Sequence, residues 1–201
     1  MRTSSTYSFI VPGGVVAVAP IGELSHLEGA ASAEDLRSVE GFGSASRRCE
    51  RLAWRALLRE MEPESRVEYL ASGKPVLKNS KYKHISVSHC SDMVAVMLSN
   101  EPCGVDVERA ERCFERVHMR YMSEAEAALS DSKYWQGVVW CAKEALYKMA
   151  GREGVDFKRD ISVKSVQPAG SLWHLVAEAF SLQVELQCEH LEDGHILVFT
   201  L

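Results

Sequence analysis

Apolar and polar positions change their spacing along the chain, and they do so in the same order in both halves. Residues 46–61 carry apolar side chains at helical spacing, from Leu52 to Met61, which predicts a helix. Ser46 is placed to cap the start of this helix, and Pro63 stops it. Short apolar runs come next, so the first half has a helix followed by strands.

The strands expected up to residue 108 are short and rich in β-branched or other apolar residues. They cover residues 15–21, 84–88, 93–98 and 103–108. The apolar stretch 9–21 is broken by Pro12-Gly13-Gly14, which favours a turn and a strand over a signal peptide. No run reaches the roughly 18 apolar residues that a membrane span needs.

The second half repeats this order. Ser123 can cap a helix over 123–129 with Glu126 at the capping-box position, and a stronger helix over 136–150 is closed by Gly151. Four strands are expected after it, at 161–166, 171–179, 184–188 and 196–201. The pattern therefore predicts an α+β protein with an N-terminal half, 1–102, and a C-terminal half, 103–201.

The composition is compatible with a soluble protein that buries a real core. The chain has 201 residues, of which 46% are hydrophobic, and its formal net charge is −5. This charge argues against general nucleic-acid binding, which usually shows a basic excess, but it allows a local basic pocket for a small polyanion. The six scattered cysteines include no CxxC pair, so we expect reduced thiols in a cytoplasmic protein rather than a zinc site.

The segment Gly104-Val105-Asp106-Val107-Glu108 is the first candidate for chemistry. Side chains alternate along a strand, so Asp106 and Glu108 share one face, while Val105 and Val107 point to the other, toward the core. Two neighbouring carboxylates repel unless a cation lies between them, and Mg²⁺ prefers oxygen ligands. The alternative is the solvated polar face of an edge strand.

A second candidate lies on the helix expected at 136–150. Trp140, Glu144 and Lys148 are spaced four residues apart and share one face, and Lys143 lies on an adjacent stripe with Tyr147. Glu144 could complete a metal site with the two acids, and the lysines could hold phosphate oxygens. An ordinary surface Glu–Lys pair is the alternative.

Two further segments could contact phosphate. Ser88 and His89 end the run Ser86-Val87-Ser88-His89 and could donate hydrogen bonds, or Ser88 could cap a turn and His89 lie on the surface. Lys74 lies in a Gly-Lys-Pro turn and is either a phosphate contact or a solvated lysine.

The order of these four motifs resembles the 4′-phosphopantetheinyl transferases, and among them the longer type. The resemblance runs from about Arg47 to Ile161 and is strongest between Lys74 and Lys148. It implies a pseudo-dimer of two similar α+β halves with the active site in the cleft between them. It also implies an enzyme that transfers 4′-phosphopantetheine from coenzyme A to a serine hydroxyl of an acyl or peptidyl carrier protein, releasing 3′,5′-ADP.

The resemblance further implies roles for individual residues. The Mg²⁺ ligands would be Asp106, Glu108 and Glu144. Coenzyme A would be held by Lys74, Ser88, His89 and Lys148, with Arg47 or Arg48 at the 3′-phosphate and Arg48 preferred. Glu144 is the candidate catalytic base, directly or through water, and Lys148 would stabilise the leaving phosphate. Val107 departs from relatives that have an acid there, which leaves that coordination position to water.

The expected partners are coenzyme A and a carrier protein of fatty-acid, polyketide or nonribosomal-peptide synthesis, without nucleic acid or membrane. Carrier proteins are typically acidic, so the basic segment 109–120 could form the docking surface, although it could equally be a solvated segment. A pseudo-dimer needs no second copy to build its site, so we expect a monomer. The alternative function is a non-catalytic protein that binds coenzyme A or a carrier. A Mg²⁺-dependent nucleotide enzyme of another kind is disfavoured, because no GxxxxGK[ST] loop occurs.

Overall fold

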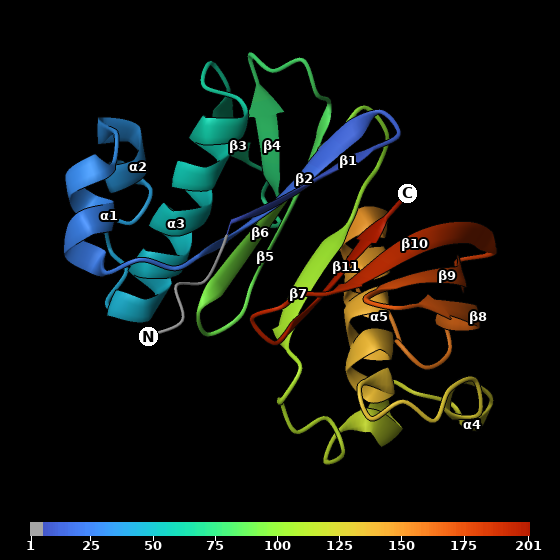
Figure 1. Ribbon diagram of the computed structural model, residues 1–201. Helices are drawn as coiled ribbons and strands as arrows, with labels where there is room; N and C mark the ends of the chain where they lie inside the picture. The colour runs from blue at the N-terminus through green and yellow to red at the C-terminus, as the bar shows by residue number, and fades with distance from the viewer. Residues whose placement is uncertain (1–5) are drawn as a thin grey trace.

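The computed structural model describes residues 6–201, and these form two antiparallel sheets, each covered by one long helix (Figure 1). The first half contains β1 (Tyr7–Val11), β2 (Gly14–Pro20), α1 (Leu24–Ala30), α2 (Ala33–Arg37), α3 (Ala45–Met61), β3 (Arg66–Tyr69), β4 (Pro75–Lys78), β5 (His84–His89) and β6 (Met93–Ser99). The second half contains β7 (Val105–Arg109), a 3₁₀ turn at His118–Arg120, α4 (Glu124–Ala127), α5 (Trp135–Ala150), β8 (Ile161–Ala169), β9 (Leu172–Ala179), β10 (Leu182–His190) and β11 (His195–Thr200). The predicted α+β class is therefore confirmed.

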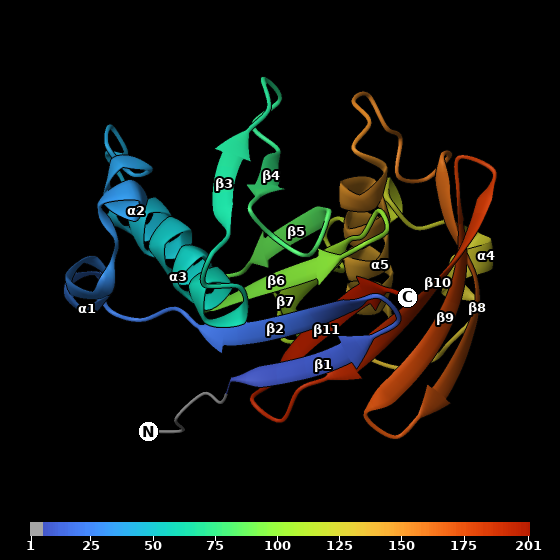
Figure 2. The same cartoon turned by 90° about the horizontal axis from the view of Figure 1, so that it is seen from above.

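The strand order explains how the halves are built. The first sheet runs β1-β2-β6-β5 and the second runs β7-β11-β10-β9-β8, while β3 and β4 pair separately as a hairpin. The layers follow in the order α3, first sheet, second sheet and α5, so that the two sheets face each other and the second sheet curves around α5 (Figures 1 and 2).

The two sheets share a core because their strands alternate. In β2, Val16 and Val18 point toward the second sheet, whereas Ala17 packs under α3. The second sheet meets them with Val105 and Val107, as predicted, and with Leu197 and Phe199 of β11. Strand β6 is buried along its whole length, since both of its faces are covered.

Most predicted elements are present, with differences at the N-terminal end. The capping box of Ser123 and Glu126 and the left-handed Gly151 at the end of α5 are both confirmed. Ser46 is not the cap of α3: the helix begins one residue earlier, and the side chain of Ser44 accepts the N–H of Arg47. The elements that the pattern did not predict are β1, the short helices α1 and α2, and the β3–β4 hairpin.

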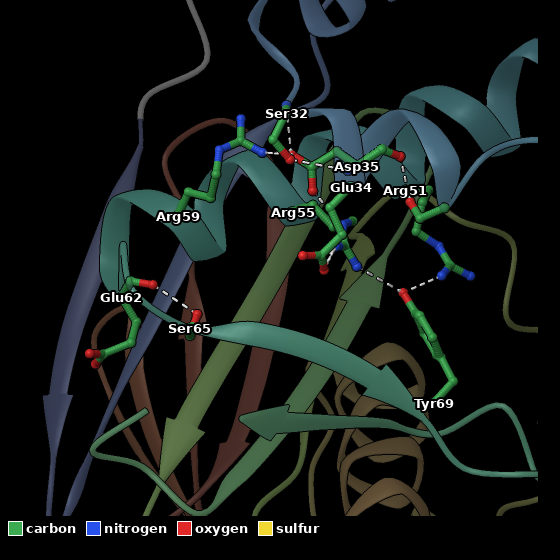
Figure 3. Close-up of polar contacts among 10 residues, drawn as sticks. Ser32, Glu34, Asp35, Arg51, Arg55, Arg59, Glu62, Ser65 and Tyr69 are labelled. Carbon is green, nitrogen blue, oxygen red and sulfur yellow. Dashed lines mark hydrogen bonds and ion pairs between the residues drawn. The ribbon is translucent and has the colours of Figure 1, made fainter. Parts of the chain in front are cut away.

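The short helix α2 is held to α3 by a buried ionic network (Figure 3). Asp35, 3% exposed, accepts hydrogen bonds from Arg55 and Arg59 of α3, and Arg55 also pairs with Glu34 at 2.6 Å. The hydroxyl of Tyr69, at the end of β3, accepts a hydrogen bond from Arg55 at 3.4 Å. The polar face of α3 therefore organises the N-terminal elements that the hydrophobic pattern could not predict.

The two sheets meet where β5 lies beside β7, and two serine hydroxyls join these strands. The Oγ atom of Ser86 accepts the N–H of Val105 at 3.1 Å, and the Oγ atom of Ser88 accepts the N–H of Val107 at 3.4 Å. Both serines are 4% exposed, so the hydroxyls replace water for two backbone donors of an edge strand.

Helix α5 lies directly against the start of β7 because Gly104 has no side chain. A Cβ atom at this glycine would lie 1.8 Å from the carbonyl oxygen of Ala145. The close approach places the middle of α5 beside the acidic segment of β7. Among residues 6–201, the helices are all too short or too polar to cross a membrane.

Replacing Gly104 by alanine should destabilise the fold, because the clash involves backbone on both sides and neither side can rotate away. We expect Gly104→Ala to lower the free energy of unfolding by at least about 2 kcal/mol. Gly43→Ala is the matched control, since a Cβ there meets nothing within 4 Å, and it should stay within about 0.5 kcal/mol of wild type. Urea denaturation followed by circular dichroism measures both, and equal midpoints for the two variants would contradict the packing argument.

Candidate active site

A pocket opens where the ends of β5 and β7 face one side of α5. Its lining consists of Val87, Ser88, His89, Asp106, Glu108, Trp140, Glu144 and Lys148. The structure thus brings together both predicted acids of β7, the predicted helix face and the end of the serine-histidine segment.

Asp106 is the central acid of this pocket. It is 5% exposed, and its Oδ1 atom accepts hydrogen bonds from Ser88 at 2.6 Å and from the Nζ atom of Lys148 at 2.7 Å. Its Oδ2 atom is buried without a hydrogen-bond partner among the described residues. Leaving a buried carboxylate oxygen unpaired is unfavourable, which indicates that a cationic or donor group belongs beside it.

Glu108 and Glu144 complete a group of three acids. Burial raises the pKa of both glutamates, and the negative charge of Asp106 raises it further. Lys148 and Arg112 act in the opposite direction, and Arg112 forms an ion pair with Glu108. Glu144 forms no hydrogen bond or ion pair with any other residue between 6 and 201.

This donor set fits a hard divalent cation. It offers three carboxylates, one of which has an unpaired buried oxygen, and within residues 6–201 the cations paired with these acids are Arg112 and Lys148. The ligand oxygens of the three acids do not all lie within 4.8 Å of one another. Three like charges are expected to stay apart in this way without a counter-ion between them.

Val87 and Lys148 line both this pocket and a larger one of about 300 Å³, which Lys74 also lines. Besides binding Asp106, Lys148 donates to the carbonyl oxygen of Val105 at 3.1 Å. The Nζ atom of Lys74 donates to the carbonyl oxygen of Lys148 at 3.3 Å, which places it at the C-terminal end of α5. Arg152 also lines the larger pocket, so three basic residues gather around it.

A third pocket adjoins these two. It distinguishes the two candidate arginines of α3, because one of them lines it and the other does not. Arg47 lines it together with His89, and its guanidinium lies 5.2 Å from the ring centre of Phe42. Arg48 instead pairs with Glu28 of α1 and lines none of the three pockets. The geometry therefore favours Arg47 for an anion beside His89, and the preference for Arg48 stays a prediction.

The serine-histidine segment has two different roles. Ser88 is buried and donates to Asp106, so its hydroxyl positions the acid and joins β5 to β7. His89 is exposed, with its Nε2 atom 3.7 Å from Glu50, and it lies at the boundary between two of the pockets. Only His89 presents an uncommitted face to a ligand.

Lys143 does not hold phosphate, contrary to the interpretation of its helical stripe. It is fully buried and donates to three backbone carbonyls, of Tyr121, Phe157 and Ile161, at 2.6–2.8 Å. It also pairs with Glu126 at 2.7 Å. A lysine with four fixed acceptors ties α5 to the loops around it, so its function is structural.

Sequence reasoning missed the roles that three residues have in the site. Arg112 neutralises Glu108 from an i,i+4 position and stacks on Trp140 at 5.2 Å, and this spacing could have been noticed. Arg152 lies in a loop after α5 and belongs to no sequence motif that would have indicated its position in the site. Gly104 gives no chemical signal at all, because only the distance to α5 explains it.

Removing the charge of Lys143 should destabilise the protein strongly, since the buried carboxylate of Glu126 would lose its cationic partner. We expect Lys143→Met to lower the free energy of unfolding by about 3 kcal/mol, and adding Glu126→Gln should restore part of it. The exposed Lys83→Met variant is the control and should change stability by less than about 0.5 kcal/mol. A Lys143→Met protein as stable as the control would show that the buried pair is dispensable. Chemical denaturation measures all four proteins.

The comparison with known proteins agrees with the position of this site. No curated protein is similar enough to the chain to count as a match. A family model does match residues 102–200, the segment that holds Asp106, Glu108, Glu144 and Lys148. The family that this model describes is the 4′-phosphopantetheinyl transferase superfamily, and residues 102–200 are similar to it.

Proposed function

We propose that this protein is a Mg²⁺-dependent 4′-phosphopantetheinyl transferase, which moves the phosphopantetheine arm of coenzyme A to a serine of a carrier protein. The observation that carries the proposal is the buried, unpaired oxygen of Asp106 among three acids, inside the segment that matches the family. A pocket for a metal–pyrophosphate group needs both clustered carboxylates and nearby basic groups, and both are present.

The three adjoining pockets supply a binding surface for coenzyme A. Val87 lines all three, His89 lines two, and Lys148 lines two, so the surfaces are continuous. We assign the pyrophosphate to the side of Lys148 and Lys74. The 3′-phosphate is assigned to Arg47, because it is exposed and has no carboxylate partner among the described residues.

Asp106, Glu108 and Glu144 would hold the Mg²⁺ ion, together with phosphate oxygens and water. When bound, the ion neutralises charge on the pyrophosphate as the reaction proceeds. Arg112 would have to release Glu108 when the ion enters, and its exposed side chain allows this movement.

The chemistry follows from the positions of two side chains. The oxygen of the carrier serine bonds to the β-phosphorus of coenzyme A, while the bond from that phosphorus to the oxygen of the 3′,5′-ADP moiety breaks. The hydroxyl proton passes to Glu144, directly or through water. Burial raises the pKa of Glu144, which favours proton acceptance, and the ammonium of Lys148 stabilises the leaving phosphate.

The surface beside the site offers a place for an acidic carrier protein. Arg116, Met119 and Arg120 are exposed, with Met119 at 65%, and the two arginines form no ion pair within the part of the chain described. Arg109 and Arg112 are already paired with Asp92 and Glu108, so only the later part of the predicted basic segment is available. We assign carrier docking to this later part.

The repeated arrangement of one long helix on one antiparallel sheet supports a pseudo-dimeric origin, with the division between residues 102 and 103. Because both halves and their shared core come from one chain, we propose a monomer. Cys49, Cys90, Cys103, Cys113, Cys141 and Cys188 are free thiols, which supports a cytoplasmic location.

The intact mass of an apo carrier protein tests the reaction. Incubation with the protein, coenzyme A and Mg²⁺ should add one phosphopantetheine arm, and EDTA should prevent the addition. Asp106→Asn keeps the size of the side chain but removes its charge, so we expect transfer at least about a hundredfold slower with an unchanged circular dichroism spectrum. The exposed Asp131→Asn variant should transfer at the wild-type rate.

Two outcomes would count against this proposal. Wild-type turnover by Asp106→Asn would remove the metal assignment. Binding of coenzyme A without transfer to fatty-acid, polyketide or peptide carriers would instead favour the non-catalytic binding protein.

The two arginines of α3 can be separated by their effect on coenzyme A. We expect Arg47→Ala to raise the KM for coenzyme A about tenfold with little change in kcat, because a charged phosphate contact is lost. Arg48→Ala removes an ion pair with Glu28 and should leave KM unchanged. The reverse result would return the 3′-phosphate to Arg48. Steady-state kinetics with dephospho-coenzyme A, in which wild type and Arg47→Ala should become similar, provides the control.

A further inference from the structure

Cys90, Asp92 and His195 form a compact group outside the acidic pocket. Cys90 and Asp92 lie in the turn between β5 and β6, whereas His195 begins β11 in the other sheet. The Sγ atom of Cys90 lies 3.5 Å from Oδ1 of Asp92, and the Nε2 atom of His195 lies 3.1 Å from the same oxygen. The three ligand atoms all lie within 4.8 Å of one another.

The distances of 3.5 Å and 3.1 Å are close to the edges of a tetrahedral zinc site. With Zn–S at about 2.3 Å and Zn–N and Zn–O at about 2.0 Å, tetrahedral angles separate ligand atoms by roughly 3.3–3.6 Å. A thiolate, an imidazole and a carboxylate together are typical zinc ligands, whereas Mg²⁺ avoids sulfur. The types of ligand therefore distinguish this group from the three acids, which suit Mg²⁺.

His195 is held in the orientation that a metal ligand needs. Its side chain is 1% exposed, and its Nδ1 atom lies 2.8 Å from Oδ1 of Asp193. Because that contact keeps the proton on Nδ1, the neutral ring would present the lone pair of Nε2 toward Cys90 and Asp92. A carboxylate behind a ligating histidine is the usual outer support of a zinc site.

The charges around the group also balance a dication. The thiolate of Cys90 and the carboxylate of Asp92 would neutralise Zn²⁺, while Arg109 and Asp193 offset each other behind them. Arg109 binds both oxygens of Asp92, with its Nε atom 3.0 Å from Oδ1, and Ser91 also donates to Oδ1 at 3.0 Å, so the carboxylate is oriented from outside. In the metal-free protein, burial lowers the pKa of His195, but hydrogen bonds with Cys90, Asp193 and Asp92 raise it to about 9.

We propose that Cys90, Asp92 and His195 bind a zinc ion, with a fourth position open to water. Zinc would be held by the thiolate of Cys90 and the neutral imidazole of His195, so any proton on the Sγ or Nε2 atom passes to solvent when the ion binds. The half-buried Cys90 and the 33%-exposed side chain of Asp92 leave an entry path from solvent.

The site would clamp the two sheets together beside the acidic pocket. Cys90 follows His89 directly, and Arg109 follows Glu108, so both strands that carry pocket residues end at this group. Zinc would tie the end of β5 to β11 and hold the two halves in register. We therefore expect zinc to stabilise the fold as a whole.

Cobalt is a spectroscopic probe for this site, because thiolate coordination gives a charge-transfer absorption in the near ultraviolet. Protein treated with a chelator and kept in excess Mg²⁺ should bind one equivalent of Co²⁺ with this absorption, and Zn²⁺ should displace it. Cys90→Ser should lose the absorption and bind Zn²⁺ at least tenfold more weakly, because serine is a poor zinc ligand. Cys113→Ser, which removes an exposed thiol elsewhere, should behave as wild type.

Two further variants keep the test decisive. Asp92→Asn should also weaken Zn²⁺ binding at least tenfold, and it serves if Cys90→Ser fails to fold. Asp106→Asn should bind Co²⁺ normally, which separates this site from the proposed Mg²⁺ site whatever the outcome of the transfer assay. A wild-type protein without the absorption, or a Cys90→Ser protein that retains it, would overturn the proposal. Zn²⁺ should raise the melting temperature of wild type and not of Cys90→Ser.

Discussion

The contact between β5 and β7 is the constraint on which the rest of the molecule depends. Strand β7 is the edge of the second sheet, and the N–H groups of Val105 and Val107 face β5 of the first sheet. Ser86 and Ser88 accept these N–H groups with their hydroxyls. A side-chain hydroxyl can thus accept an N–H group of an edge strand in place of the backbone carbonyl of a neighbouring strand. Two sheets of different strand order can meet in this way without merging into one.

Ser88, one of these two serines, also orients the central acid of the acidic pocket. Ser88 donates its own proton to Asp106 while accepting the N–H of Val107, so one hydroxyl orients the central acid relative to the strand. Lys148 supplies the opposing charge from α5, which can approach because Gly104 has no side chain. The close approach of the α5 and β7 backbones therefore brings the residues of the site together, and their charges then act on one another. The pKa values of Glu108 and Glu144 follow from that assembly rather than from the residues themselves.

Periodicity and local chemistry predicted those features whose sequence pattern lies within a single helix or strand. The helices of both halves, the two-sided strands and the common face of Asp106 and Glu108 follow from spacing alone. Prediction failed where a residue acts across the fold. Lys143 looked like a surface lysine of a helical stripe, yet its four acceptors come from α4, the start of β8 and two loops. His195 is more than a hundred residues from Asp92 in sequence, so no motif could have joined them.

The shared core between the sheets has a consequence for how such a protein can be divided. The segment 102–200 matches a family model by itself, yet one face of its sheet is covered by β2 and β6 of the first half. Cut free, this segment would expose Val107, Leu197 and Phe199 together with the unpaired edge of β7. Such a surface combines apolar area with open hydrogen-bond donors, which favours self-association. The region recognisable by sequence is thus smaller than the unit that can exist alone, and the less recognisable half acts as its permanent cover.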